Sequence, residues 1–303
     1  MKTPSKGKLF VKLEGGLGNQ FYQYASCKAL AKKYGFQFEV LARMDSPNDS
    51  RRHNHLGLFN IQSPYTGKLN TLLVRMLFIQ KFNIGKWLRK RLKSNKLLTL
   101  VHDPETGYHP ELLQDAIGNV LLLGYWQSFK YFEKIKCELV EEFKLKEVPR
   151  DRENQSLNEL IPKCESIAIH IRRGDYVSEE YFLKNFGTCS LDYYQNAIAL
   201  IAERVQSPQF FIFTDDPVWV RDRLKIDYPH TFITHNLGKS DYEDFRLMSV
   251  CKHFIVANSS FSWWAAWIGN YLDKIVIAPT PWFVKDSLPQ EDRIPNEWIK
   301  LPI

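Results

Sequence analysis

Cysteine is scarce in this sequence and shows no pairing pattern. The 303-residue chain has five cysteines, which are scattered, odd in number and never spaced as CxxC: Cys27, Cys137, Cys164, Cys189 and Cys251. This usage argues against a disulfide framework and against a structural zinc site, and it indicates a reducing compartment. We therefore expect a cytoplasmic protein.

The sequence also lacks long hydrophobic runs. No run approaches the roughly 18 apolar residues of a membrane-spanning helix. The opening stretch, MKTPSKGKLFVKLEGG, is basic and has no apolar core of the kind that a signal peptide needs. Even so, 44% of the residues are hydrophobic and 14% are aromatic, so the chain can bury a sizeable core. Its length suits two domains of ordinary size.

Acidic residues are missing from one long segment. Residues 50–102 contain eleven Lys and Arg and no Asp or Glu, so the net charge of +7 arises there, and acids outnumber bases in the rest. Apolar residues recur at helical spacing within 69–77 and again within 84–92, which predicts two basic amphipathic helices. Either these helices present a solvated face, or residues 69–93 dock peripherally on an anionic inner-membrane surface or on an anionic acceptor.

The first part of the chain predicts a βαβ unit. Residues 8–14 and 37–41 have strand character, and a helical pattern runs between them from Cys27 to Tyr34. The turn GGLGNQ at 15–20 precedes the helix, but it matches neither a GxGxxG motif nor a P-loop.

Three residues of this turn are candidate ligand contacts. Gly16 would allow a ligand to approach the backbone, and the amides of Asn19 and Gln20 suit sugar hydroxyls. A tight turn with helix-capping amides explains the same residues equally well, so both interpretations remain open.

The second half has a clearer pattern. Five apolar strands alternate with helices; the strands are expected at 166–171, 209–216, 230–235, 253–260 and 274–280. This alternation predicts an α/β fold with a parallel, doubly wound sheet. The polar stretch 149–157 separates it from an irregular region, so we expect a domain boundary there, with one lobe at 1–153 and a second at 154–303.

Charged and polar residues gather where these strands end. Arg172 and Arg173 follow the first strand, with Asp175 positioned to hold a guanidinium fork bidentately after the turn at Gly174. An arginine pair at the carboxyl end of a strand suits a diphosphate. A structural Arg–Asp pair at a domain edge is the alternative.

Two further strand ends should meet the arginines at the same sheet edge. One carries Asp215 and Asp216, and the other carries 258–260, Asn-Ser-Ser, at a helix N-terminus that suits phosphate oxygens. Neither DxD, HExxH nor a His/Cys cluster is present, so we expect a site that works without a metal. The arginine motif lies outside the basic segment, which disfavours nucleic acid as a partner.

Six motifs, in this order and spacing, resemble glycosyltransferase family 11: GGLGNQFYQYA, GYWQS, HIRRGDY, FTDDP, DYEDFRLMSVCKHFIVANSSFSWWAAW and KIVIAPTPWF. The resemblance covers roughly residues 8–300. It implies an inverting α-1,2-fucosyltransferase of bacterial surface-polysaccharide synthesis. The implied fold is GT-B-like, with two Rossmann-like lobes: an acceptor-side lobe at 1–153 and a GDP-fucose-binding lobe at 154–303. It also implies GDP-β-L-fucose as donor, no obligatory metal, and a terminal galactose as acceptor in an O-antigen or capsule glycan.

The resemblance also implies roles for individual residues on the donor side. Arg172 matches the arginine that grips the donor diphosphate, with Arg173 and Asp175 supporting it and His170 near the nucleoside. Asp244 matches the acid that reads guanine. Ser259, Ser260 and Phe261 match the phosphate-binding turn, and Asp215 is assigned a further contact with the donor.

Elsewhere the resemblance implies less. Asn19 and Gln20 match the contribution of the N-terminal lobe to the cleft. Phe186 stands where family members often carry a histidine, so an acceptor contact by that histidine does not transfer. No carboxylate stands out as a general base; Asp175, Glu179 and Glu180 are the nearest to the motif. The competing hypothesis is a non-catalytic protein of the same fold that binds a nucleotide sugar or a polysaccharide.

Overall fold

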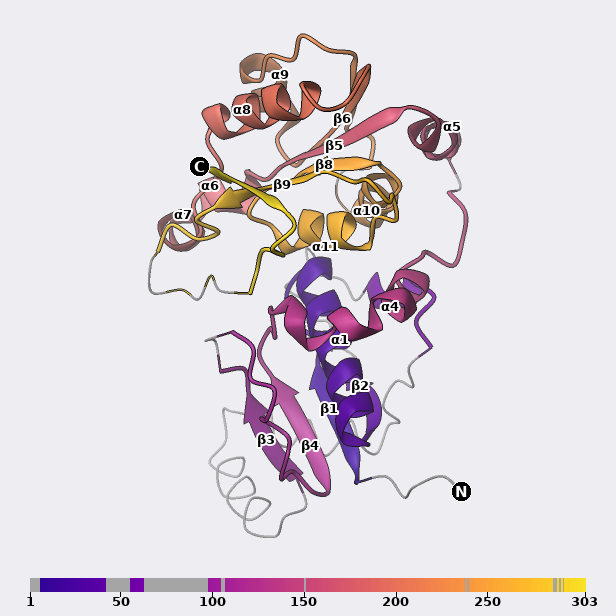
Figure 1. Ribbon diagram of the computed structural model, residues 1–303, viewed down its shortest axis with the longest axis vertical. Coiled ribbons are helices and arrows are strands. Elements are labelled where there is room, and N and C mark those ends of the chain that lie inside the picture. The colour runs from indigo at the N-terminus through magenta and orange to yellow at the C-terminus, as the bar shows by residue number, and fades with distance from the viewer. Residues whose placement is uncertain are drawn as a thin grey trace. The chain divides into compact units, whose positions relative to one another are not determined.

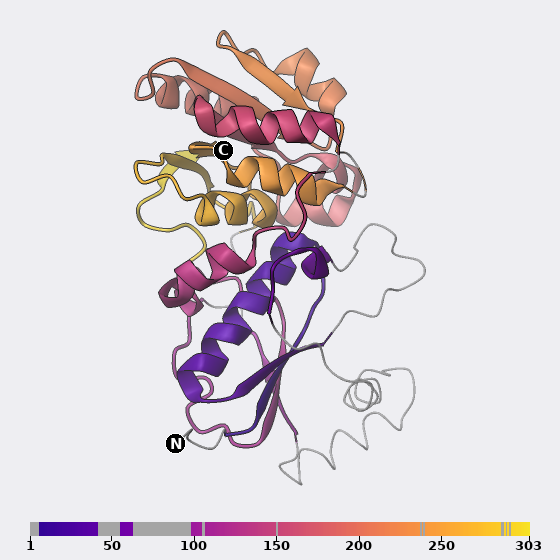
Figure 2. The ribbon, with the colours of Figure 1, turned by 90° about the vertical axis from the view of Figure 1, so that its right-hand side faces the viewer.

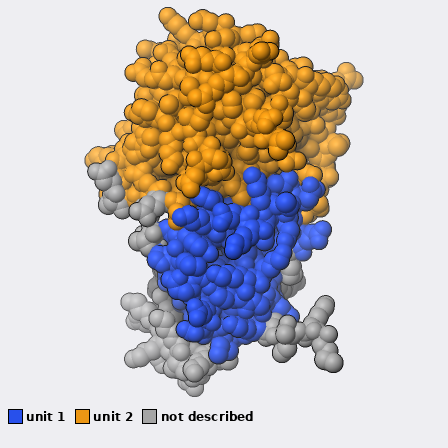
Figure 3. Space-filling view, viewed as in Figure 1, with its two compact units in different colours: residues 1–57, 61–142 blue, residues 58–60, 143–303 orange. Residues whose placement is uncertain are grey.

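The protein divides into two compact units. The computed structural model describes residues 6–41, 55–62, 98–104, 107–149, 151–236, 238, 240–285, 288, 290 and 292–303. The first unit comprises residues 1–57 and 61–142, and the second comprises residues 58–60 and 143–303 (Figure 3). The basic helices expected at 69–93 lie outside the described residues. Among the described residues, no helix is long and apolar enough to cross a membrane.

The first unit begins with the βαβ arrangement that the sequence predicts. Strand β1 (Lys8–Lys12) and strand β2 (Gln37–Leu41) pair in parallel, and helix α1 (Leu17–Tyr34) connects them. Helix α1 runs along one face of the sheet (Figure 2). It ends at Gly35, which has a left-handed backbone (φ 78°) and donates its N–H to Ala31 O.

Two more parallel strands complete the first sheet. Strand β3 (Leu98–His102) and strand β4 (Asn119–Leu123) extend it in the order β2-β1-β4-β3. The sequence analysis treated this region as irregular and missed both strands. The unit also contains η1 (His55–Leu58), η2 (Phe129–Tyr131), η3 (Glu133–Ile135) and α4 (Lys136–Glu142).

The second unit is built on a six-stranded parallel sheet in the order β10-β9-β8-β5-β6-β7. Its strands are β5 (Glu165–Ile171), β6 (Pro208–Thr214), β7 (His230–Ile233), β8 (His253–Ile255), β9 (Val276–Thr280) and β10 (Ile299–Pro302). Five of these strands were predicted. The sixth, β10, was missed because its four residues, IKLP, alternate too briefly to stand out from a loop.

Helices cover both faces of this sheet, as a doubly wound fold requires (Figure 1). The helices of this unit are α5 (Arg152–Leu160), η4 (Ile161–Lys163), α6 (Gly174–Ser178), α7 (Glu180–Asn185), α8 (Leu191–Ala202), α9 (Pro217–Arg223), α10 (Asp241–Ser249) and α11 (Ser260–Ile268).

Strand β5 shows how the sheet serves both faces. Ile167, Ile169 and Ile171 pack in one core with residues of α8 and α9. The alternate residues point to the other face, where His170 meets the side chain of Ser262 on α11. The period of two along this strand therefore directs one set of residues to the core and presents His170 to the opposite layer.

The boundary between the units falls earlier than the sequence analysis placed it. Residues 143–149 belong to the second unit, whereas the boundary was predicted after residue 153. Phe143 packs edge-on against Trp264 at 5.2 Å between ring centroids, and the Glu147 carbonyl accepts a hydrogen bond from Arg246. These contacts with α10 and α11 explain why residues 143–149 belong to the second unit, although they lead into a polar stretch that resembles a linker.

Candidate active site

The Arg172 guanidinium lies between two carboxylates just beyond β5. Its Nη2 donates to Asp175 Oδ1, and its Nη1 lies beside Asp215 Oδ2, both at 2.6 Å. Burial works against the charged guanidinium, but Asp215 and then Asp175 raise the pKa of Arg172. The prediction that Asp175 alone holds both arms of the fork is wrong, because Asp215 engages the second arm.

Arg173 is held separately from Arg172. Its backbone N–H donates to Asp215 Oδ1 at 2.8 Å, and its Nε donates to Asp216 Oδ2 at 3.1 Å. The guanidinium carbon lies 3.5 Å from the ring centroid of Trp219, a stacking contact that suits the flat arginine group. Asp216 also caps α9 by accepting from the Trp219 N–H.

Gly174 has a steric role here. A Cβ at this position would lie 2.5 Å from Asp215 Oδ2, so only glycine lets that carboxylate approach the backbone beside both arginines. The sequence analysis gave Gly174 the role of a flexible turn residue. The structure instead places Gly174 at the start of α6 and against Asp215, the acid that contacts both Arg172 and Arg173.

The arginine cluster has a net negative formal charge, because two guanidinium groups face the carboxylates of Asp175, Asp215 and Asp216. Each contact uses only part of a guanidinium, which carries five N–H donors. Among the described residues, Arg172 donates one N–H, from Nη2 to Asp175, and its Nη1 lies beside Asp215 as an ion pair, so the rest of its fork can face a ligand. The acids fix its orientation and leave donors for an anion.

His170 is a neutral residue at the base of the site. It is 7% exposed, and burial, with a smaller contribution from Arg172, lowers its pKa to about 3. Its Nδ1 lies 2.9 Å from the Ser262 hydroxyl, which in turn donates to Ser259 O at 3.4 Å. A histidine of this pKa is a poor base at neutral pH.

The N-terminus of α11 lies beside His170. Ser259 caps the helix, and its hydroxyl accepts from the Phe261 N–H at 3.4 Å. The ring of Phe261 is 5.8 Å from that of His170, while Ser260 and Phe261 remain partly exposed. Backbone N–H groups at such a helix start favour an anion. The Arg172 motif and this helix start both follow neighbouring strands, β5 and β8, so the structure brings them to one sheet edge.

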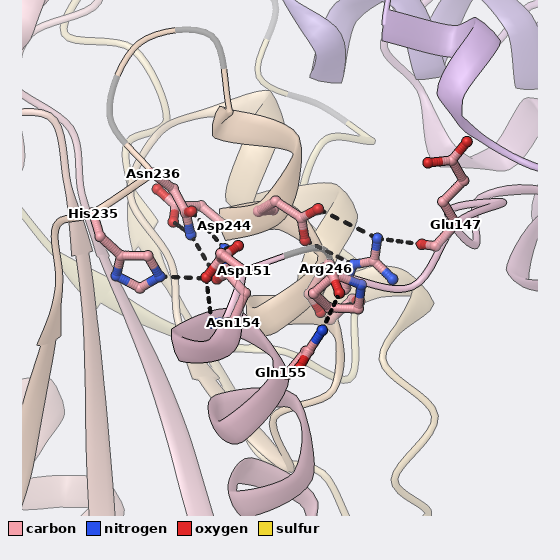
Figure 4. Close-up of polar contacts among 11 residues, drawn as sticks. Glu147, Asp151, Asn154, Gln155, His235, Asn236, Asp244 and Arg246 are labelled. Carbon is pink, nitrogen blue, oxygen red and sulfur yellow. Dashed lines mark hydrogen bonds and ion pairs between the residues drawn. The ribbon is translucent and has the colours of Figure 1, made fainter.

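Asp244 lies on α10, at one end of a buried polar network (Figure 4). Asn236 Nδ2 donates to Asp244 Oδ1 at 2.9 Å. Burial raises the pKa of Asp244 to about 7; the Asn236 hydrogen bond opposes this effect, and Asp241 and Glu243 add to it. The carboxyl therefore changes charge near neutral pH.

The three candidates in the first unit differ in accessibility. Gly16 is exposed, and a Cβ there would meet no atom within 4 Å. Asn19 is partly buried, and its Oδ1 accepts from Gln127 Nε2 at 2.7 Å. Gln20 is fully buried and donates to Gly15 O at 3.0 Å, so its side chain holds the turn. Their contribution to a sugar site stays a prediction.

Several residues that shape the site were not singled out from the sequence. Ser262 orients His170, Trp219 stacks on Arg173, and Asn154 and Asn236 lead to Asp244. Of these residues, only Trp219 could have been found from the sequence, since it lies in the first turn of the predicted helix that follows Asp215 and Asp216. Within the described residues, no group of three or more His, Cys, Asp or Glu side chains is arranged to hold a metal ion.

Comparisons with known proteins agree with this chemistry. The chain matches the family model described as Glycosyl transferase family 11 over residues 2–302. It is 32% identical to an alpha-1,2-colitosyltransferase of Escherichia coli, with 96% of this chain and 97% of the relative covered. It is 31% identical to the O-antigen biosynthesis glycosyltransferase WbnK of Escherichia coli, with 95% of this chain and 99% of the relative covered.

The fold also matches solved structures at low sequence identity. The fucosyltransferase NodZ from Bradyrhizobium superposes with a TM-score of 0.51 and 15% identity, covering 87% of this chain and 92% of NodZ. The predicted α/β, GT-B-like fold, with a parallel sheet in each of two Rossmann-like units, is thus confirmed. Since the family model covers nearly the whole sequence, this chain belongs to glycosyltransferase family 11.

Proposed function

We propose that this glycosyltransferase moves L-fucose from GDP-β-L-fucose to the 2-hydroxyl of a terminal galactose, with inversion, in the synthesis of a bacterial O-antigen or capsule glycan. The observation that carries the proposal is the oriented Arg172 fork, held at 2.6 Å by Asp175 and by Asp215 beside a helix N-terminus. Relatives named for α-1,2 transfer and for O-antigen biosynthesis support the linkage and the pathway.

The arrangement suits departure of a nucleoside diphosphate. Breaking the glycosyl–phosphate bond builds negative charge on the leaving GDP and positive charge on the sugar. A preorganised guanidinium binds the developing charge more strongly than it binds the ground state, and so it lowers the barrier. The N–H groups at the start of α11 would add to this effect without a divalent metal.

Asp175 is better suited to orienting Arg172 than to removing a proton. Its Oδ1 is engaged by Arg172 at 2.6 Å, so this oxygen is already occupied by the contact that orients the guanidinium. Because the transition state of glycosyl transfer resembles an oxocarbenium ion, the acceptor hydroxyl can lose its proton late, and a strong base is not required.

Asp244 is the proposed guanine-reading residue. Guanine presents two adjacent donors, its N1–H and its 2-amino group, and one ionised carboxylate accepts from both. Losing this acceptor should weaken GDP binding by about 1–3 kcal/mol. We expect Asp244→Asn to bind GDP about 5- to 150-fold more weakly at pH 8 and to bind ADP no more weakly than the natural protein does. Unaltered GDP affinity in isothermal titration would place guanine recognition elsewhere.

Colitosyl transfer is a second candidate, favoured by the colitosyltransferase relative. Colitose lacks only the 3-hydroxyl of L-fucose, so the choice between them depends on contacts to that position. Competing GDP-fucose and GDP-colitose with one galactoside acceptor would decide it. Faster transfer from GDP-fucose supports our proposal. A strong preference for GDP-colitose would change the assigned donor to GDP-colitose and would leave the proposed α-1,2 linkage unchanged.

A further inference from the structure

Two buried asparagines of the second unit form a reciprocal amide pair (Figure 4). Asn154 Nδ2 donates to Asn236 Oδ1 at 2.7 Å, and Asn236 Nδ2 donates back to Asn154 Oδ1 at 2.9 Å. Asn154 is on α5 and Asn236 follows β7, and they are 1% and 3% exposed. Burying two amides is costly unless their hydrogen bonds are satisfied, so the partners of the remaining atoms matter.

Asn154 is satisfied on its far side. Its second Nδ2 hydrogen goes to Asp151 Oδ2 at 2.7 Å, and its Oδ1 also faces His235 Nε2 at 2.9 Å. Asp151 accepts in addition from the Asn154 backbone N–H at 2.8 Å as the cap of α5. These contacts fix which end of the Asn154 amide is oxygen and which is nitrogen.

The orientation of Asn236 follows from that of Asn154. Its Oδ1 must face the Asn154 donor, so its amide nitrogen points to Asn154 Oδ1 and, with the second hydrogen, to Asp244 Oδ1 at 2.9 Å. Turning the Asn236 amide over would set its oxygen against both the Asn154 oxygen and the Asp244 carboxylate. The cap of α5 therefore determines that Asp244 faces a donor.

Asp244 is held by one oxygen only. Among the described residues, its Oδ2 has no hydrogen-bond partner, whereas Oδ1 accepts from Asn236. A donor to the carboxylate favours its ionised form, while burial and nearby acids favour the protonated form. The packed strand β6 and helix α11 carry no ionisable side chain. The ionisable neighbours on α10 are Asp241 and Glu243, the latter paired with Arg246 at 2.8 Å. Those on other segments are Asp151 and Glu153 at α5 and His235 beside Asn236.

The protonation state of such a carboxyl decides which purine it fits. An ionised carboxylate accepts twice and matches the N1–H and 2-amino donors of guanine. A protonated carboxyl donates once and accepts once, and it matches the N1 acceptor and 6-amino donor of adenine. The same side chain can therefore discriminate against adenine or pair with it, depending on one proton.

We propose, building on the guanine-reading role of Asp244, that Asn236 is the positioning residue that keeps this carboxyl in its accepting state and thereby makes the nucleotide site selective for guanine over adenine. Asn154 and the α5 cap act through Asn236 by fixing its amide. Guanine selectivity then depends on a residue that does not itself touch the base.

Isothermal titration of the full chain with GDP and with ADP, from about pH 5.5 to about pH 8.5, tests this proposal. For the natural protein, GDP affinity should fall towards tenfold per pH unit below the midpoint of Asp244, which lies at about 7, and the ratio of GDP to ADP affinity should fall with it. In Asn236→Leu, loss of the donor should move this midpoint up by about one unit or more and lower GDP affinity at pH 7 by about fivefold or more.

A second variant guards against simple loss of packing. Asn236→Asp keeps the shape but sets a carboxyl against Asp244, which should raise the midpoint further because two neighbouring carboxyls resist ionising together. Gln155→Leu is the control, since it removes an amide on the same helix that donates to Pro149 O at 2.8 Å. Its midpoint should match that of the natural protein.

The outcomes separate positioning from a merely structural role. A raised midpoint in both Asn236 variants, with GDP affinity recovering at high pH, supports the proposal. An unmoved midpoint, or a loss of GDP affinity that is equal at every pH, overturns it and leaves the proposed transferase intact. If the natural protein binds GDP no better than ADP at any pH, the proposed donor site itself is wrong.

Discussion

Replacing Arg172 by lysine should remove most of the activity while keeping the charge. The guanidinium reaches two acids with different nitrogens, Asp175 through Nη2 and Asp215 through Nη1, each at 2.6 Å. One ammonium cannot bridge both carboxylates and also present a flat row of donors to a diphosphate. We expect kcat/KM to fall by about 10²-fold or more, as when one preorganised donor is removed from a transition-state site.

The same substitution should cost some stability. A lysine would leave one of the two acids poorly paired, which should lower the free energy of unfolding by about 1–3 kcal/mol. The cost stays in this range because the Arg172 side chain is 32% exposed and water reaches the site. Arg221→Lys is the matched control: Arg221 lies on α9 of the same unit, exposed and against the ring of Phe232. Steady-state kinetics and thermal melting would measure both variants. An Arg172→Lys enzyme with natural kcat/KM and an unchanged fold would refute the assignment.

Four further predictions concern other parts of the chain. Gly174→Ala should push Asp215 from its place, because the new Cβ would lie 2.5 Å from Oδ2 of a carboxylate that both arginines pin; kcat/KM should drop by about tenfold, and natural kinetics would contradict the steric role. Activity should persist in excess EDTA, because Asp215 and Asp216 are engaged by arginines; loss that Mg²⁺ or Mn²⁺ restores would make these acids metal ligands. Asp244→Asn should raise the melting temperature above that of the natural protein at pH 8, and by much less at pH 4. A carboxyl whose pKa is raised to about 7 destabilises the fold increasingly as pH rises from about 4 to about 7, and the amide removes this penalty; an equal difference at both pH values would contradict the raised pKa. Sedimentation with vesicles should increase with anionic lipid and decrease with salt if residues 69–93 dock on a membrane, and no binding at low salt would leave that segment a solvated face.

Most of the second unit was predictable because β5, β6, β8 and β9 are largely buried and are separated by helices with recognisable caps. Ser190 and Asp216 cap the helices that the sequence predicted, each by accepting from a backbone N–H three residues on. The first unit was harder. Strands β3 and β4 are short and are separated from β2 by a long stretch without clear alternation, so their pairing with β1 depends on non-local contacts.

The site was predictable where one residue type suffices for a role. Arginines after a strand and serines before a helix indicate anion binding by themselves. Partners brought from distant segments carry no such local signal. Asp215 lies far from Arg172 in sequence, and Asn154 reaches Asp244 only through Asn236. A carboxylate that holds an arginine and an amide that orients a carboxylate both become visible only in three dimensions.

Transferase activity is tested most directly by incubating the protein with GDP-β-L-fucose and a β-galactoside, and determining the linkage of the product by NMR. We expect released GDP to match newly formed fucosyl-α-1,2-galactose, with the anomeric configuration inverted relative to the donor. GDP-fucose binding without any glycoside product would instead identify a nucleotide-sugar-binding protein of the same fold, and a product with another linkage would contradict the proposed acceptor position.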